Sequence, residues 1–189
     1  MTRRLSPAFV SSCCLALILA GCSEKPAPPP PPKPPPAAEV KALWDRMIGA
    51  ATRCDNAYAY LSSQLDTAVA EAQAGRVSDF SGAATAAQTS ELICDNARNE
   101  VAQLTPPPSS AGENKAAYTR VLQGCADAYG QRAAAAHRVT ALAAEGFKTD
   151  AGEREKAAAE QSNETLKACL LGFTDTAKAS GMTLKDLRG

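Results

Sequence analysis

The sequence contains few aromatic residues and almost no histidine. Phenylalanine, tryptophan and tyrosine together make up 5% of the 189 residues, and His137 is the only histidine. A single histidine excludes the histidine–carboxylate di-iron sites that some helical bundles hold. The chain also lacks a Cys-x-x-Cys pair, a glycine-rich phosphate loop, and the Gly-x-Ser-x-Gly and His-Glu-x-x-His motifs of hydrolases. We therefore expect no enzyme activity, no cofactor and no metal site.

An excess of charge of either sign is absent as well. The full chain has 20 basic and 20 acidic residues. Without residues 1–21, which include Arg3 and Arg4, 18 basic residues remain against 20 acidic ones, a net charge of about −2. Such a balance gives no electrostatic footprint for nucleic acid or for an anionic membrane face.

The N-terminal residues have the order of an export signal. Residues 1–4 contain two arginines and no acid, and residues 5–20 contain no charged side chain. The most apolar part, residues 13–20, is too short to span a bilayer, which takes about 20 apolar residues. A basic start followed by a short apolar segment indicates a secretory signal peptide over residues 1–21 rather than a membrane helix.

This signal ends in Leu19-Ala20-Gly21-Cys22, which resembles the lipobox of bacterial lipoproteins. In that family the cysteine thiol receives a diacylglyceryl group, the signal is cut just before the cysteine, and the new amino terminus is usually acylated as well. The resemblance implies cleavage between Gly21 and Cys22, and attachment of lipid with acyl chains such as palmitate to Cys22. Two or more acyl chains anchor a protein stably, whereas a single chain holds it only marginally.

The residue after Cys22 indicates the membrane to which the lipoprotein is sorted. It is Ser23 and not aspartate, which in enterobacteria-like sorting implies the outer membrane. We expect the domain to lie in the periplasm, with the inner membrane or the cell surface as alternatives. An ordinary signal peptide that contains a cysteine is the alternative to lipidation.

Proline dominates the predicted linker, residues 22–38. Nine of the 11 residues from Pro26 to Pro36 are proline. Proline fixes φ and removes a hydrogen-bond donor, so neither a helix nor a sheet ladder is expected there. An extended polyproline II rod with about 3.1 Å per residue would reach roughly 30–35 Å. We interpret the segment as a spacer; the alternative is a ligand for a proline-reading domain.

Apolar residues after the linker recur at alternating steps of three and four, the spacing of a helical seam. This spacing predicts helices over residues 40–75, 78–104, 110–146 and 150–181. Gly75, Gly146 and Gly181 are the expected C-caps, and the three prolines at 106–108 end the second helix. Four long helices with short connections predict an all-α fold, namely an antiparallel four-helix bundle of two helical hairpins over residues 39–189.

Three details of the helical pattern are less regular. Residues 110–113 (Ser-Ala-Gly-Glu) fit a capping box, in which the serine and glutamate side chains bond free amides at a helix start. Arg132 falls near the apolar stripe of the third helix, so that seam is interrupted. The residues after Gly181 are expected to fold back as a short apolar tail that contains Met182, Leu184 and Leu187.

The chain also contains a short internal match. Residues 54–58 (Cys-Asp-Asn-Ala-Tyr) resemble residues 125–129 (Cys-Ala-Asp-Ala-Tyr). A glycine lies 21 residues beyond each of these cysteines, at Gly75 and Gly146. The match predicts two similar hairpins, although alanine-rich helices resemble one another easily.

Four cysteines remain once Cys13 and Cys14 leave with the signal and Cys22 carries lipid. They are Cys54, Cys94, Cys125 and Cys169, one on the apolar seam of each predicted helix. An even number in an exported protein predicts disulfides. We favour Cys54–Cys94 with Cys125–Cys169, which close the shorter loops; Cys54–Cys169 with Cys94–Cys125 is the rival. Free buried thiols and a zinc site are further alternatives, but zinc usually draws its ligands in close pairs.

These features favour a structural or protein-binding lipoprotein of the cell envelope, whose partner is an envelope protein or the cell wall. The alternative is a carrier of a small ligand, metal or haem in the core of the bundle. Met47 and His137 would be the axial ligands of a haem in such a carrier, but a lone histidine such as His137 is more typical of a surface or capping position.

Overall fold

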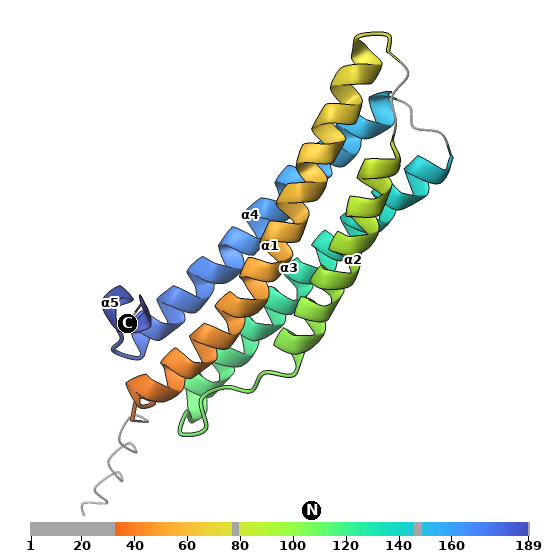
Figure 1. The fold of residues 1–189 in the computed structure, drawn as a ribbon. Coiled ribbons are helices and arrows are strands. Elements are labelled where there is room, and N and C mark those ends of the chain that lie inside the picture. Colours follow the sequence, from red (N-terminus) through yellow and green to blue (C-terminus); the bar gives the residue numbers. More distant parts are fainter. Residues whose placement is uncertain (1–32, 77–79, 146–148, 189) are drawn as a thin grey trace, which may run out of the picture. The chain divides into compact units, whose positions relative to one another are not determined.

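The computed structural model describes residues 33–76, 80–145 and 149–188 (Figure 1). The expected signal peptide, the cleavage site between Gly21 and Cys22, and most of the proline-rich linker lie outside the described residues. Gly146, the expected C-cap of the third helix, also lies outside them.

Five helices make up the described part of the chain, and this part contains no strand. Their bounds are α1 Ala37–Gln73, α2 Ser81–Ala102, α3 Gly112–Ala144, α4 Thr149–Ala179 and α5 Leu184–Arg188. The prediction of an all-helical fold is therefore confirmed. Each long helix packs against the next one along the chain, and α1 also packs against α4 and α5 (Figure 1).

The first helix begins two residues before the expected domain boundary at residue 39. Pro36 is the residue before it, and its carbonyl accepts hydrogen bonds from the amides of Glu39 (3.1 Å) and Val40 (3.4 Å). Proline is tolerated at a helix start because the first amides of a helix have no partner within it. Pro35 is buried, so the end of the proline-rich segment is part of the folded domain.

Two glycines end helices as the sequence predicts. Gly75 has φ 69° and Gly181 has φ 86°, a region that residues with a Cβ rarely adopt. At the first of these ends, the amide of Arg76 donates to the carbonyl of Glu71, and the amide of Gly75 donates to the carbonyl of Ala72. The same pair of bonds recurs at Gly181, so both ends are Schellman motifs.

The capping box predicted at residues 110–113 is wrong. The N-cap of α3 is Ala111, which makes no side-chain cap bond. The hydroxyl of Ser110 instead donates to the carbonyl of Pro107 at 2.6 Å. This loop is also tied to α1, since Glu39 accepts bonds from the amide and hydroxyl of Ser109 at 3.0 and 2.7 Å.

Phe173 of α4 belongs to the larger core cluster. Its ring is fully buried and lies 5.3 Å from the ring of Trp44 on α1 and 5.8 Å from that of Tyr118 on α3, measured between centroids. Aromatic pairs of this kind contribute about 0.5–1.5 kcal/mol beyond their buried area. One side chain thus connects three helices.

The predicted apolar tail does fold back, as α5, onto α1. Met182 and Leu187 are buried, whereas Leu184 is 43% exposed. None of the described helices combines the length and the apolar character that crossing a membrane requires.

Both disulfides join consecutive helices. Cys54 of α1 bonds Cys94 of α2, and Cys125 of α3 bonds Cys169 of α4. This is the pairing that the sequence favoured over its rival. The Cα atoms are 4.7 and 4.9 Å apart, and the four side chains are buried, so each pair of helices is held together from within the core.

Candidate functional site

The contacts that join the first two helices to the last two differ in character. On one side, Ala86 and Ala87 of α2 share a buried cluster with Ala135 and Ala136 of α3. Small side chains allow helix axes to approach closely, and the contact between α2 and α3 is the most extensive in the domain. The helices α1 and α4 touch each other much less, and a groove lies between them.

This α1–α4 groove has a polar and an apolar half. The polar half has a volume of about 560 Å³ and is lined by Asp55, Asn56, Tyr58, Ala59, Ser62, Ser63, Asp66, Arg132, Lys156, Ala159, Glu160 and Asn163. The apolar half has a volume of about 310 Å³ and is lined by Trp44, Asp55, Arg132, Asn163, Leu166, Lys167, Leu170, Leu171 and Thr174. Three residues, Asp55, Arg132 and Asn163, line both halves and mark the place where the two halves meet.

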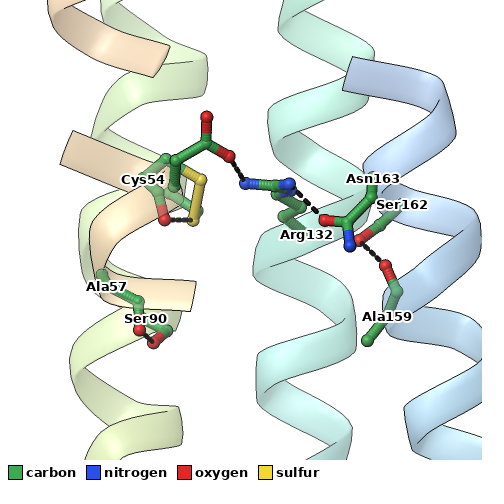
Figure 2. The surroundings of a disulfide bond; sticks show 9 residues. Cys54, Ala57, Ser90, Arg132, Ala159, Ser162 and Asn163 are labelled. Atoms are coloured by element: carbon green, nitrogen blue, oxygen red, sulfur yellow. Dashed lines mark hydrogen bonds and ion pairs between the residues drawn. A yellow bond between two sulfur atoms is a disulfide. The ribbon is translucent and has the colours of Figure 1, made fainter. Parts of the chain in front are cut away.

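Arg132 is the buried cation at the middle of the groove. Figure 2 shows its guanidinium, carried by α3, between α1 and α4. It donates to the carboxylate of Asp55 on α1 and to the side-chain carbonyl of Asn163 on α4, and it lies 5.1 Å from the centre of the Tyr58 ring. The side chain of Arg132 is 5% exposed, and the side chain of Asp55 is 47% exposed. The residue that interrupts the predicted seam therefore links three helices.

The short match between residues 54–58 and 125–129 aligns Arg132 with a leucine. Relative to the matching cysteines, Arg132 lies seven residues after Cys125, and Leu61 lies seven residues after Cys54. Both side chains are buried, with relative exposures of 4% and 2%. The match therefore aligns a buried leucine of α1 with the buried arginine of α3.

Two polar atoms next to this ion pair are buried and have no hydrogen-bond partner among the described residues. They are Nε of Arg132 and the hydroxyl of Tyr129, which lies one turn before it on α3. Burial raises the pKa of the Tyr129 hydroxyl far above its usual range; Asp55 raises this pKa further and Arg132 lowers it. Tyr129 is therefore neutral at physiological pH, and unsatisfied buried groups of this kind call for an explanation other than stability.

We expect Asp55→Ala to lower the free energy of unfolding by about 2 kcal/mol. The change leaves Arg132 buried without its counter-ion, a loss that reaches 3–5 kcal/mol for fully buried pairs and is smaller here because Asp55 is half exposed. The double variant Asp55→Ala/Arg132→Leu should recover to within about 1 kcal/mol of the parent, since apolar replacements of buried ion pairs are often neutral or stabilising. Urea titration measures both. A double variant less stable than Asp55→Ala would show that the charge is needed for folding.

The apolar half of the groove exposes large side chains. Leu171 is 54% exposed, and Trp44 and Leu170 are only partly buried against the core. Isolated exposed leucines are common on protein surfaces. Here, however, the exposed leucine lies in a concave site together with a tryptophan, and aromatic anchors in grooves are typical of binding surfaces.

His137 lies on the other side of the domain, in a groove between α2 and α3. Its side chain is 67% exposed, and its Nδ1 lies 3.0 Å from a carboxylate oxygen of Glu91. Met47 is fully buried in the core, so the two residues considered as haem ligands do not converge on one site. Within the described ranges, no three His, Cys, Asp or Glu side chains gather as metal ligands would.

The sequence pointed to the four cysteines, which the structure brings together in pairs, but not to the groove. Asp55 and Arg132 are 77 residues apart, and only the irregular seam at Arg132 hinted at their contact. Cys22 and Gly21 lie outside the described residues. No protein-family model matches the chain, and neither a curated protein nor a solved structure shows significant similarity to it.

Proposed function

We propose that this chain is a lipoprotein of the bacterial envelope that binds a protein partner along the α1–α4 groove. Lipid on Cys22 would hold it at the outer membrane, and the proline-rich linker would space the helical domain from the lipid headgroups into the periplasm. The observation that carries the binding role is the groove itself, which is half polar and half apolar and has the buried Arg132 where the two halves meet.

We further propose that the domain is an antiparallel four-helix bundle made of two hairpins. The order of contacts supports this arrangement, since each long helix touches the next and α1 closes the set by touching α4. The disulfides support it too, because each one joins the two helices of one hairpin. In such a bundle the α1–α4 groove is the seam between the first and the last helix.

A rigid groove suits recognition by contact. The disulfides fix α1 to α2 and α3 to α4, so each wall of the groove is bonded to a neighbouring helix and loses little internal freedom when a partner binds. The groove is also open along its length and not enclosed, which fits a segment of protein better than a small molecule sequestered in the core.

Site-specific photocrosslinking in cells tests the proposal. A photoreactive amino acid is introduced at Leu171, in the apolar half of the groove, and at Leu92 as the matched control. Leu92 is also an exposed leucine, 63% against 54%, but it lines the groove between α2 and α3. We expect a protein adduct of defined mass from position 171 only. Equal adducts from both positions, or an adduct from position 92 alone, would contradict the proposal.

We expect His137→Ala to leave both the fold and the crosslinked adduct unchanged. His137 makes one exposed contact, with Glu91, and exposed ion pairs contribute about 0–1 kcal/mol. The free energy of unfolding and the yield of the Leu171 adduct are the measurements. Loss of the adduct from a folded His137→Ala protein would move the binding site to the other groove, or favour a ligand-carrying role.

A further inference from the structure

We infer that the end of the domain at which α1 begins docks on an anionic phospholipid surface, so that the helix axes point away from the membrane. This inference rests on the proposed function, which anchors the chain through Cys22, and adds a second contact with the same membrane. Three observations support it: the segments that meet at this end, the unpaired bases that they expose, and the opposite charge of the other end.

Four parts of the chain meet at this end, which we call the tether end (Figure 1). They are the start of α1, the loop that leads into α3, the C-terminal end of α4, and α5. Glu39 of α1 accepts two bonds from Ser109 of the loop. The hydroxyl of Tyr118 in α3 donates to that of Ser180, just after α4, at 3.2 Å, and α5 packs against α1. The proline-rich linker enters here too, because Pro35 is buried just before α1.

The tether end exposes more bases than acids. Residues 33–46, 103–120 and 175–188 contain eight bases and five acids, a net charge of +3. Lys41 and Lys178 are paired with aspartates on their own helices. The other six bases are exposed, and no described carboxylate lies within ion-pair distance of them: Lys33, Arg46, Lys115, Arg120, Lys185 and Arg188. These side chains remain available to phosphate groups.

Most acids of the tether end already have partners. Asp45 and Asp175 pair with the two lysines, and Glu39 is held by the loop. Asp186 accepts bonds from the amide and the hydroxyl of Thr183, both at 2.7 Å. Of the five acids, only Glu113 makes no side-chain contact of this kind with a described residue. The unpaired charge at this end is therefore almost entirely positive, and an anionic surface is its complement.

The opposite end of the domain carries the opposite charge. Residues 66–76, 80–88, 138–145 and 149–160 contain seven acids and four bases, a net charge of −3. Lys156 and Asp66, which lie 2.7 Å apart, join two of these segments. The near-neutral charge of the whole chain therefore conceals a separation of charge along the helix axes. An anionic membrane attracts the tether end and repels the other end, and both effects favour the same orientation.

The lipid anchor makes a weak contact sufficient. Near an anionic membrane, each lysine or arginine favours contact roughly fivefold. An anchored domain already stays close to the surface, so a few bases are enough to hold its end there. The linker limits how far the tether end can move from Cys22, but it does not fix the angle at which the chain leaves the membrane. A spacer and a membrane contact are therefore compatible.

Docking of the tether end also places the α1–α4 groove. The apolar half includes Trp44 and Thr174, near the start of α1 and the end of α4. The polar half includes Asp66 and Lys156, towards the opposite end. In the docked orientation the apolar half lies nearer the membrane. A partner that fills it must therefore present a segment close to the lipid surface.

Energy transfer to an acceptor dye on lipid headgroups measures which end lies near the membrane. The donor dye is attached to a cysteine added by Ala116→Cys or Ala141→Cys. Both positions are exposed on α3, on the same side of the helix and about 37 Å apart along it. The four cysteines of the domain are bonded in pairs, so only the added thiol reacts.

The mature lipoprotein is reconstituted in vesicles of phosphatidylcholine, with or without phosphatidylglycerol. We expect phosphatidylglycerol to raise energy transfer from position 116 above that from position 141. In about 1 M salt the Debye length falls from about 8 Å to about 3 Å, so the difference should disappear. Equal transfer from position 116 in both kinds of vesicle, or higher transfer from position 141 in the anionic vesicles, would overturn the inference.

Charge variants decide whether the bases are responsible. Lys33→Gln/Lys185→Gln removes two unpaired bases of the tether end and should lower the ratio of docked to undocked protein roughly 25-fold. Arg76→Gln/Arg154→Gln removes two exposed bases of the opposite end and is the matched control, which should dock as the parent does. Docking that survives the first double variant would contradict the inference. If lipid and the Leu171 adduct are found but docking is not, the proposed function stands and the inference fails. A chain without lipid on Cys22 would overturn both.

Discussion

Replacing Cys54 and Cys94 by alanine should lower the free energy of unfolding by about 4 kcal/mol, and so should replacing Cys125 and Cys169. The two bonds close loops with sequence separations of 40 and 44 residues. In the chain-entropy model the stabilisation depends on the logarithm of loop length, so loops this similar should give nearly equal effects. Removal of both should cost about 8 kcal/mol, comparable to the whole stability of an ordinary domain. We therefore expect the four-alanine protein to be largely unfolded at 37 °C.

Urea titration of the oxidised parent and of each alanine pair gives these values. The parent in strong reductant is the control, because reduction opens the same loops without removing side chains. All four sulfur atoms are buried, so reduction should be slow until the protein unfolds. A loss of less than about 1 kcal/mol on removing either pair would show that core packing alone holds the hairpins. Alkylation of unreduced protein should find no free thiol among the four cysteines.

The Cys22→Ser protein should no longer reach the processed, membrane-bound form. Without the thiol, diacylglyceryl transfer cannot occur, and the peptidase of the lipoprotein class would not cut an unmodified precursor. We expect either uncut precursor or soluble protein, in place of a processed membrane-bound form. Fractionation, followed by mass spectrometry of the N-terminal peptide, distinguishes these species.

Ser23→Ala, a change beside the same site, is the control and should remain processed and membrane-bound. The unfolding free energy of the helical domain should be the same in all three proteins, because α1 begins only at Ala37. A Cys22→Ser protein that is processed normally and stays membrane-bound would mean that the lipobox resemblance is misleading.

The helices could be predicted because their seams depend on local spacing. Steps of three and four residues placed Met47, Cys54, Tyr58 and Leu61 on one buried face of α1, and all four are buried. The glycines with positive φ at Gly75 and Gly181 ended helices where the sequence indicated. The start of α3 was harder to predict, because Ser110 had two partners within reach. It bonds the carbonyl of Pro107 rather than an amide of the helix.

The groove could not be predicted in the same way. A helical seam tells which residues face inward, but not which neighbouring helix will pack tightly against them. That depends on pairs of residues far apart in sequence, such as the alanines of α2 and α3 or Asp55 and Arg132. A charged residue on an apolar stripe, as at Arg132, is the signal that marks such a position. Its meaning becomes clear only when the partner on another helix is known.

The position of the first disulfide also determines how the domain responds to mechanical force. A pull applied to the chain before Ala37 can unwind α1 only as far as Cys54, where the bond to Cys94 carries the load onto α2. Fully extended, these residues span about 60 Å at 3.3–3.6 Å per residue, which is about 35 Å more than they span as a helix. The segments between Cys54 and Cys94 and between Cys125 and Cys169 cannot lengthen at all while their sulfurs stay bonded. Trp44 lies within the stretch of α1 that unwinds, whereas Asp55 follows Cys54 and stays with the disulfide-linked part. Force would therefore disrupt the apolar half of the groove first.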